Sequence, residues 1–578
     1  MFSLHDPIDD EVRKAFAAYD DFTAALLSRR GIKTKEEAEA FLSPSYDEHI
    51  HDPMLITDMP KAAARVAAAI NSGERITVWS DYDCDGIPGG VILHDFLKKA
   101  GANFTNYIPH RHLEGYGVNT DGIEKLAKEG TKLVITVDSG ITDNEAVARA
   151  SELGMDVIVT DHHLPGKELP PAFAVVDPNA RVDETYPFRE LCGAALAWKL
   201  VCATLAQGFN GREKIPVGWE KWLLDMAGLA TIADMVPLSG ENRVIAKYGL
   251  YVMRKSPRIG LQKLCKAARV NQRFIDEGDV GFMIAPRVNA ASRMGDPREA
   301  FRLFTTEDES EAETLAKGLE SLNRTRRATA GAITRAVHEK IEARLLEGKE
   351  LGTVIALGDP DWRPGLLGLV ASGIADEYER PVFLWGREGN DTLKGSCRSG
   401  PGKVSVNAIM IAAKDTFIEF GGHAVSGGFS IAPNAVFDLE DRLVAALASM
   451  PAGELIEIPR ADGELTPEQA TSKLLSSLER FAPYGMKNEK PKFAFPNVLL
   501  QEVSWFGKAG EHLRIKILRG DEQFPDVPLE AICFYAKREL GNISTKIEPG
   551  ERRHVMAFLE KDQFSRGQPI RLRLIAIS

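Results

Sequence analysis

The chain has 578 residues, which at about 100–200 residues per domain corresponds to roughly three to five domains. Hydrophobic residues make up 44% and charged residues 27%, which excludes wholesale disorder, and no apolar run reaches the roughly 18 residues that cross a bilayer. The net charge of −12 argues against a nonspecific DNA coat but leaves room for a local basic channel. The N-terminal sequence lacks a secretory pattern and the 6 cysteines form no CxxC pair, so we expect a cytoplasmic protein without membrane segments.

Helices and strands alternate along the first half of the chain. Small helices are predicted for residues 1–50, and short Val/Ile-rich strands alternate with helices from about 60 to 240. This alternation predicts a parallel sheet that is covered by helices on both faces. Residues 305–347 contain no proline and have helical periodicity, which predicts one long connecting helix, interrupted at most near Gly318 or Gly331.

A second α/β unit follows, built from GTVIAL, PGLLGLVASGIADEY, PVFLW and the glycine-rich GGHAVSGGFS. From about residue 495, short strands of alternating polarity predict a small β-barrel. The expected fold is therefore α/β, with two α/β domains joined by a long helix and a C-terminal barrel. The predicted divisions are a helical segment at 1–50, the first α/β domain at 51–300, the connecting helix at 301–348, the second α/β domain at 349–455 and the barrel at 456–578.

Three predicted strands of the first α/β domain end in an aspartate. ITVWS leads to Asp81, LVITV to Asp138 and DVIVT to Asp161, and in an open parallel sheet the working site lies outside the carboxyl ends of the strands. A further candidate is Asp234, which is flanked by apolar residues in ATIADMVPL. If these segments converge at the sheet edge, their carboxylates cannot all stay ionised unaided. Either their pKa values rise or cations neutralise them.

Oxygen ligands with one or two imidazoles suit Mn²⁺ or Mg²⁺, and two such ions bridged by a carboxylate hydrolyse phosphoester bonds. Each piece also has an ordinary structural reading. An aspartate after a strand is more often a helix N-cap, and DYDCDG lacks the later Glu of an EF-hand. Because acidic motifs follow three predicted strands, the sequence favours a metal site over these separate structural roles.

The motifs SDYDCDG, VDSG, TDHH and ADMVP, in this order, resemble the four motifs of the DHH phosphoesterase superfamily. The segments YIPHRHLEGYGVN, APRVNAASRMGD, GSCRS, GGHAVSGG and FAPYGMKNEKPKF extend the resemblance, over some 500 residues, to the RecJ-type single-strand-specific exonucleases. The resemblance implies that the second α/β unit is a DHH-associated domain that holds the substrate and that the barrel is an OB-fold.

The resemblance also implies roles for single residues. Asp138 would bridge two metal ions, Asp161 would orient His162 by a hydrogen bond, and His163 would contact the scissile phosphate or the leaving oxygen. The expected metal ligands are Asp81, Asp83, Asp85, Asp138, His162 and Asp234. The expected catalytic residues are Asp138, Asp161 and His163.

A pocket for the 5′-terminal phosphate is implied by further motifs, because arginine holds phosphate oxygens bidentately and side-chain-free backbone cradles them. Each arginine alone could instead form a surface salt bridge, and the glycine loop could be a hairpin turn. The expected substrate-binding residues are Arg111, Arg287, Arg293, Ser396, Arg398, Gly421, Gly422 and His423. In the barrel, residues such as Trp505 and Arg514 suit stacking and charge contacts with a single strand, or fill the barrel core.

The resemblance implies a metal-dependent exonuclease that degrades single-stranded DNA from 5′ to 3′ into nucleoside 5′-monophosphates in DNA recombination and repair. Because no GxxxxGK[ST] motif occurs, we expect a helicase to open duplexes for it, with a single-strand-binding protein as a second partner and a monomeric enzyme. One alternative is a phosphodiesterase for short oligonucleotides or cyclic dinucleotides, but such relatives resemble only the two α/β units. Another is a non-enzymatic single-strand binder, which would have lost the acids.

Overall fold

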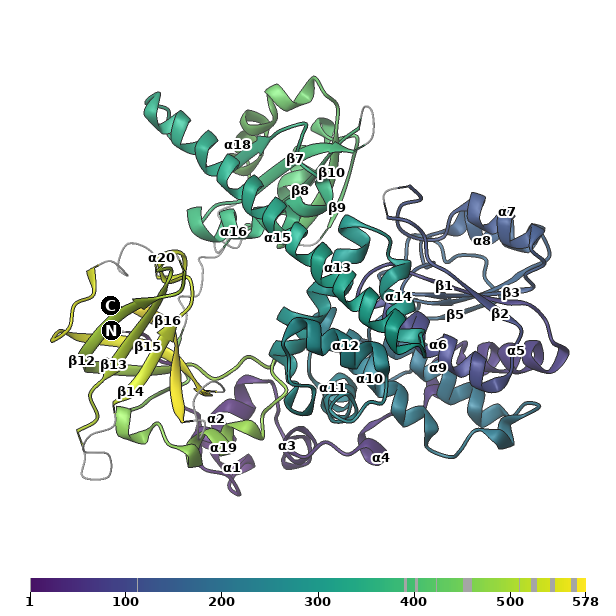
Figure 1. Ribbon diagram of the computed structural model, residues 1–578, viewed down its shortest axis with the longest axis horizontal. Coiled ribbons are helices and arrows are strands. Elements are labelled where there is room, and N and C mark those ends of the chain that lie inside the picture. The colour runs from purple at the N-terminus through teal and green to yellow at the C-terminus, as the bar shows by residue number, and fades with distance from the viewer. Residues whose placement is uncertain are drawn as a thin grey trace. The chain divides into compact units, whose positions relative to one another are not determined.

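The computed structural model describes residues 2–111, 113–388, 392–400, 404–422, 424–450, 460–508, 510–520, 528–540, 546–562 and 569–578 (Figure 1). The chain divides into two compact units. The first consists of Met1–Asn289, Pro297–Lys317 and Pro459–Ser578, and the second of Ala290–Asp296 and Gly318–Ile458. Among the described residues, no helix combines the length and hydrophobicity that a membrane span requires.

Four short helices open the first unit, and polar side chains cap the starts of the first three. The Asp20 side chain accepts the N–H of Thr23, and Thr34 with Glu37 forms a capping box. The helices are α1 (Asp10–Ala15), α2 (Asp21–Arg29), α3 (Lys35–Leu42) and α4 (Tyr46–His49).

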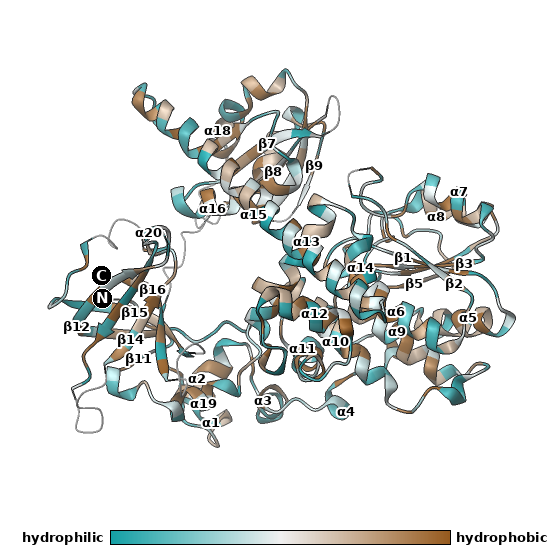
Figure 2. Cartoon of the chain, viewed as in Figure 1, coloured by the Kyte–Doolittle hydropathy of each residue, from teal (hydrophilic) through white to brown (hydrophobic). Residues whose placement is uncertain are grey.

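The first sheet is parallel, in the order β2-β1-β3-β4-β5, and confirms the α/β prediction. Its strands are β1 (Ile76–Ser80), β2 (Phe104–Tyr107), β3 (Leu133–Val137), β4 (Asp156–Thr160) and β5 (Ala174–Val176). The helices around it are α5 (Met59–Ser72), α6 (Gly86–Ala100), α7 (Thr120–Lys128), α8 (Asn144–Glu152) and α9 (Gly193–Gln207), which cover both faces (Figure 1). The central strands are fully buried and are drawn in brown in Figure 2.

A helical layer follows the sheet. Helices α10 and α11 pack backbone to backbone because both carry glycine at the crossing; a Cβ on Gly228 would lie 2.6 Å from the Cα of Gly249. The elements are α10 (Leu224–Ala233), α11 (Gly240–Met253), α12 (Ile259–Ala268), a π-helical turn (Asp279–Ile284), α13 (Ala285–Met294) and α14 (Arg298–Thr305).

The predicted connecting helix is α15 (Glu309–Leu346), which runs 38 residues without a break. Gly318 and Gly331 are therefore tolerated inside it, since a glycine costs a helix interior only about 1 kcal/mol. Ile333, Val337 and Ile341 on this helix belong to a buried core of the second unit.

The second unit has a mixed sheet in the order β6-β7-β8-β10-β9, in which only β6 and β7 pair in parallel. Separate hydrophobic cores form around α16 and around α17 with α18. The elements are β6 (Ile355–Gly358), α16 (Pro364–Tyr378), β7 (Val382–Glu388), β8 (Thr392–Arg398), α17 (Val406–Ala412), β9 (Glu419–Gly422), β10 (Ser426–Ile431) and α18 (Leu439–Ala448).

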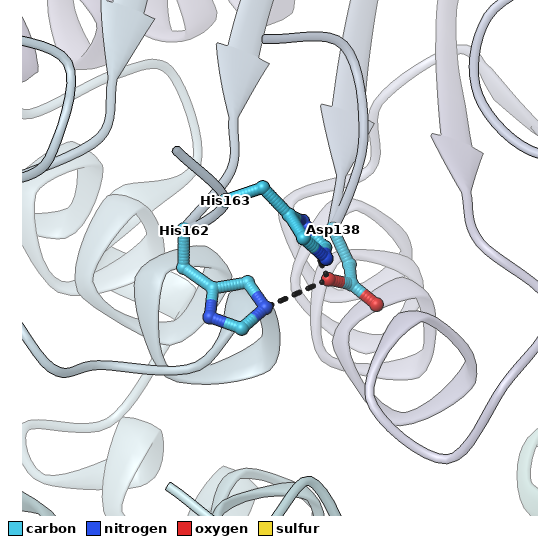
Figure 3. Close-up of side chains that lie close together, drawn as sticks. All are labelled: Asp138, His162 and His163. Carbon is cyan, nitrogen blue, oxygen red and sulfur yellow. Dashed lines mark ion pairs between the residues drawn. The ribbon is translucent and has the colours of Figure 1, made fainter. Parts of the chain in front are cut away.

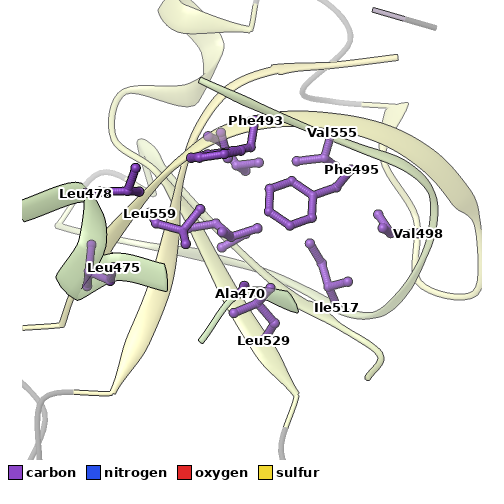
Figure 4. Packing of buried hydrophobic residues seen from close by; sticks show 14 of the residues in the cluster. Ala470, Leu475, Leu478, Phe493, Phe495, Val498, Ile517, Leu529, Val555 and Leu559 are labelled. Carbon is purple, nitrogen blue, oxygen red and sulfur yellow. The ribbon is translucent and has the colours of Figure 1, made fainter. Parts of the chain in front are cut away.

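The C-terminal strands close into the predicted barrel, because β12 pairs with both β13 and β15. Phe493, Phe495 and Val555 fill its interior (Figure 4), and the same core continues into α2 and α3 through Leu26, Leu27, Phe41 and others. The elements are β11 (Gly463–Glu464), α19 (Ser472–Glu479), β12 (Phe493–Phe506), β13 (His512–Ile517), β14 (Leu529–Cys533), α20 (Ala536–Glu539), β15 (Arg552–Lys561) and β16 (Ile570–Ile577).

Candidate metal centre

The acid-tipped strands converge at one edge of the first sheet, as the sequence predicted. β1 aligns with β3, and β3 with β4, so the residues that follow these strands meet outside their carboxyl ends. Among the residues that the structure describes, three groups of side chains bring their ligand atoms within 4.8 Å of one another. The groups are Asp138 with His162 and His163, Asp85 with His162 and Asp234, and Asp81 with Asp83 and Asp138.

Figure 3 shows Asp138 with His162 and His163, whose rings both approach its carboxylate. The Nε2 atom of His162 is 3.2 Å from Oδ1 of Asp138, and 3.7 Å from Oδ2 of both Asp85 and Asp234. Asp138 is a member of two of the ligand groups, one with Asp81 and one with His162. This sharing is the arrangement that a bridging carboxylate requires.

Close backbone packing holds the acids in place. A Cβ on Gly86 would lie 2.5 Å from the Asp81 carbonyl oxygen, so the loop after β1 closes tightly only with glycine there. At the start of α9, the backbone N–H groups of Gly193 and Ala194 donate to the two oxygens of Asp85, at 2.6 and 2.7 Å. Asp85 is thereby fixed against the N-terminus of a helix, which favours its negative charge.

Burial raises the pKa of several acids in the cluster. The pKa values of Asp81, Asp85 and Asp138 rise by burial and by neighbouring carboxylates, and burial with the charges of Asp85 and Asp83 raises that of Asp234 to about 9. Among the described residues, the buried Oδ1 atoms of Asp81 and Asp138 have no hydrogen-bond partner. Unpartnered carboxylate oxygens with neutral imidazole fit divalent cations that prefer oxygen ligands.

The predicted hydrogen bond from Asp161 to the His162 ring is wrong. Oδ1 of Asp161 accepts instead from Nδ1 of His163 at 2.8 Å and from the backbone N–H of His162 at 2.8 Å. Burial opposes a charge on His163, but Asp161 outweighs it and raises the pKa of His163 to about 9. Burial lowers the pKa of His162, which keeps its ring neutral and able to bind a metal.

Sequence reasoning missed several residues that support the cluster. The Tyr116 hydroxyl donates to the Asp138 carbonyl oxygen at 2.9 Å, and the Asn289 side chain accepts the N–H of Cys84 at 2.9 Å. Asp177 follows β5 and is fully buried, so a fourth strand also ends in an acid. Its position after a strand was a detectable signal, whereas Tyr116 and Asn289 reach the site from segments that carry no acid pattern.

Two arginines of the expected phosphate pocket lie against the first turns of α16. Nη1 of Arg293 donates to the Gly365 carbonyl oxygen at 2.6 Å, and Nη2 of Arg398 lies 2.8 Å from where a Cβ on Gly368 would be. Ser396 alternates with Arg398 along β8 and so shares its face of the sheet. Arg293, Ser396 and Arg398 therefore belong to one region of the second unit.

The remaining expected contacts are distributed between the units. In the first unit, the Arg111 guanidinium lies 5.0 Å from the Tyr82 ring centroid, and Nη1 of Arg287 donates to the Met283 carbonyl oxygen at 2.5 Å. Gly421 and Gly422 pair with β10 as the edge strand β9, so they lie in a β-hairpin. His423 lies outside the described residues.

Aromatic and basic side chains gather on the barrel. Trp505 is 38% exposed, and the Lys537 ammonium lies 6.0 Å from its ring. The Arg514 guanidinium lies 5.1 Å from the Phe506 ring, which in turn contacts His512. Trp505 is thus a surface residue, outside the buried barrel core.

Three known domains match the chain in order. These are the DHH family, N-terminal domain, over residues 75–231, the DHHA1 domain over residues 351–449 and the RecJ OB domain over residues 461–576. The single-stranded-DNA-specific exonuclease RecJ of Escherichia coli is 30% identical over 513 residues, which cover 85% of this chain and 86% of that protein. The chain belongs to the RecJ family.

Other RecJ proteins agree. The RecJ exonuclease of Bacillus subtilis is 35% identical over 531 residues, 92% of this chain, although the chain spans only 64% of that protein's length. A crystal structure of Thermus thermophilus RecJ with Mn²⁺ is 28% identical with a TM-score of 0.80, covering 100% of this chain and 78% of that one. A structure of the same protein with Mg²⁺ has a TM-score of 0.74 at 26% identity, covering 100% and 77%.

These RecJ matches confirm the expected fold of DHH domain, DHHA1 domain and C-terminal OB barrel. They also agree with the chemistry of the acid cluster. Its oxygen and imidazole ligands suit Mn²⁺ and Mg²⁺, the two ions present in the T. thermophilus RecJ structures. The side chains of the cluster are positioned to hold divalent metal ions.

Proposed function

We propose that this protein is a metal-dependent exonuclease that hydrolyses single-stranded DNA from the 5′ end and releases nucleoside 5′-monophosphates. The observation that carries the proposal is the acid cluster, in which Asp138 belongs to two of the ligand groups. Two ions joined by one carboxylate are an apparatus for phosphoester hydrolysis. The relatives named single-stranded-DNA-specific exonuclease RecJ support the substrate.

Two ions, Mn²⁺ or Mg²⁺, would be held by residue sets that meet at Asp138. One set is Asp81, Asp83 and Asp138; the other is Asp85, His162 and Asp234 together with Asp138. When bound, such ions act as Lewis acids on the phosphate and lower the pKa of the attacking water.

His163 acts beside the ions as a cationic donor. Its raised pKa keeps it protonated at neutral pH, and Asp161 holds the Nδ1 side of the ring. Nε2–H is then available to the scissile phosphate or the leaving oxygen. Asp161 thus orients His163, which faces the substrate. The ring of the expected metal ligand His162 instead lies beside Asp85, Asp138 and Asp234.

The 5′-terminal phosphate is assigned to arginine and backbone donors. Arg293 and Arg398, which lie against the first turns of α16, would bind it together with Ser396, since guanidinium forks match phosphate oxygens. The other assigned contacts are Arg111, Arg287, Gly421, Gly422 and His423.

The barrel would hold bases ahead of the cut. Exposed Trp505 and the cations Lys537 and Arg514 suit stacking and backbone contacts that ignore base identity. We place the enzyme in the cytoplasm as a monomer acting in DNA recombination and repair, where a helicase and a single-strand-binding protein supply its substrate.

A time course on single strands labelled at the 5′ or the 3′ end, with Mn²⁺, Mg²⁺ or EDTA, tests the proposal. We expect labelled mononucleotide to appear first from the 5′ end, and no cleavage in EDTA. Asp138→Asn should lower kcat by about 10³-fold or more, because several kcal/mol of charge stabilisation is lost; the exposed Asp183→Asn is the control. Activity in excess EDTA, or cleavage confined to very short oligonucleotides, would contradict it.

A further inference from the structure

Tyr116, in the loop between β2 and α7, reaches into the acid cluster. Its hydroxyl donates to the carbonyl oxygen of Asp138 at 2.9 Å and lies 3.2 Å from Nδ1 of His163. The rings of Tyr116 and His163 meet edge to face, with centroids 5.8 Å apart at 68°. Tyr116 therefore contacts two residues that are themselves separated along the chain.

The directions of these hydrogen bonds are set by chemistry. The Asp161 carboxylate is an acceptor, so Nδ1 of His163 carries a hydrogen, which is shared between Asp161 at 2.8 Å and the Tyr116 oxygen at 3.2 Å. The Tyr116 oxygen thus accepts from His163, and its own O–H donates to the Asp138 carbonyl. One hydroxyl links the substrate-facing imidazole to the backbone of the shared carboxylate.

The Asp138 backbone needs such support. Its φ of 60° lies in the left-handed region, which a residue with a Cβ occupies only at a cost of about 1–3 kcal/mol. Its N–H donates to the carbonyl oxygen of Thr160 at 3.0 Å, so the hydroxyl of Tyr116 holds the other side of this residue. A rotation of the backbone here would swing the Asp138 carboxylate away from His162.

The loop that carries Tyr116 is itself fixed to the turn after β3. The N–H of Val118 donates to Oδ2 of Asp143 at 2.6 Å, and a Cβ on Gly117 would lie 2.7 Å from the same atom. Glycine at 117, with its φ of 87°, lets the loop approach that carboxylate. Tyr116 is held at a fixed distance from Asp138 by this anchor.

We propose that Tyr116 is a positioning residue whose hydroxyl holds the Asp138 carboxylate and the His163 imidazole in one catalytic geometry. The inference rests on the proposed exonuclease function. Packing does not account for the residue, since its side chain is 49% exposed. The hydroxyl is the part of it that joins the two groups.

Tyr116→Phe tests the proposal, because it removes the hydroxyl and keeps the ring. We expect kcat on single-stranded DNA to fall about 10- to 100-fold, the range typical for residues that orient metal-site groups, with KM changed less than about 3-fold. Mn²⁺ affinity by calorimetry without DNA, and strand binding in EDTA by fluorescence anisotropy, should match the wild type. Tyr484→Phe is the matched control, since that hydroxyl also donates to a backbone carbonyl, of Leu478 at 2.6 Å.

Two results would overturn the inference. One is a Tyr116→Phe enzyme with wild-type kcat, or with a loss that Tyr484→Phe reproduces. The other is a loss that saturating Mn²⁺ restores, because the hydroxyl would then only strengthen metal binding. A wild-type protein that does not cut single strands contradicts the exonuclease proposal itself, so the two failures are distinguishable.

Discussion

At the scale of single residues, the first unit concentrates buried acid at one sheet edge. Asp177 extends this pattern: it is fully buried, its Oδ1 accepts the Asn179 N–H at 2.7 Å, and its Oδ2 has no hydrogen-bond partner among the described residues. Burial and the charge of Asp161 raise the pKa of Asp177 to about 8. A carboxyl with this pKa makes folding sensitive to pH.

The first prediction concerns Asp177→Asn. The folded pKa of about 8 exceeds the unfolded value of about 3.9, so the folded state binds an extra proton between these values and loses stability as pH rises through them. The neutral amide removes this loss, which grows by about 1.4 kcal/mol for each pH unit in that window. We expect the variant to gain stability over the wild type as pH rises from 5 to 9.

Urea unfolding in EDTA at both pH values measures the difference. Asp183→Asn, a nearby exposed aspartate, controls for the loss of one surface charge. A gap between Asp177→Asn and wild type that is equal at pH 5 and pH 9 would refute the titration of Asp177.

At the scale of elements, helix α16 and strand β8 position the proposed phosphate contacts. Gly368 on α16 leaves room for the Arg398 guanidinium, whereas Gly373 on the same helix has no atom within 4 Å of its missing Cβ. An added methyl group would meet Arg398 at position 368 and open space at position 373. Alanine substitutions at these two positions therefore separate an effect on the proposed phosphate contacts from an effect on the stability of the helix.

The second prediction is that Gly368→Ala displaces Arg398 and weakens the preference for a 5′-phosphorylated end over a 5′-hydroxyl end. A bidentate charged contact is worth about 1.5–3 kcal/mol, roughly 10- to 150-fold, which sets the upper limit. Gly373→Ala should leave the preference unchanged while both variants gain about 0.5–1 kcal/mol of helix stability. The ratio of initial rates on the two substrates is the measurement, and equal ratios for the two variants would exclude Arg398 from end recognition.

The third prediction concerns strand β12 of the barrel. Trp505→Ala should raise KM for long single strands about 5- to 150-fold, because stacking contributes about 1–3 kcal/mol per base. It should leave trinucleotides unaffected, because the proposed stacking contacts hold bases several nucleotides ahead of the cut. Trp222→Ala removes another exposed tryptophan of the first unit and serves as control. Equal effects on long and short substrates would mean that Trp505 has a structural role.

At the scale of the whole molecule, the two ends of the chain share one hydrophobic core. Phe22 and Phe493 pack with centroids 5.5 Å apart, and Phe41 and Phe481 at 6.0 Å. The buried Arg243 of α11 adds a polar junction. Its guanidinium donates to the carbonyl oxygens of Phe41 at 2.6 Å, Phe481 at 2.8 Å, Ala482 at 3.0 Å and Arg480 at 3.1 Å.

The fourth prediction follows from this shared core. A chain that ends at residue 458 keeps the first fifty residues but loses the barrel, so Leu26, Leu27 and Phe41 lose their cover. We expect it to be less soluble than a chain of residues 51–458, although the latter is shorter. Soluble yield and light scattering compare the two. A higher soluble yield and less light scattering for the chain that ends at residue 458 than for residues 51–458 would show that the N-terminal helices are stable without the barrel.

The sheet, the barrel and the order of the acids were predictable from the amino-acid sequence. Strand and helix periodicities are local, and Asp81, Asp138 and Asp161 each follow a strand, so their meeting at one edge follows from parallel topology. The length of α15 was also predictable, because a proline-free run with helical periodicity can be recognised from the sequence of that segment alone. These features depend on neighbours within a few residues.

The partners of individual side chains, in contrast, emerged only from the folded chain. Asp161 holds His163 in place of His162, Tyr116 reaches Asp138 from a separate loop, and the first fifty residues complete a barrel core formed more than 400 residues later. Such contacts depend on the path of loops and on the side to which each ring turns. The periodicity of a sequence indicates neither the path of a loop nor the orientation of a ring, because it describes one segment at a time. A hydrogen bond between distant residues is fixed by how two segments pack together.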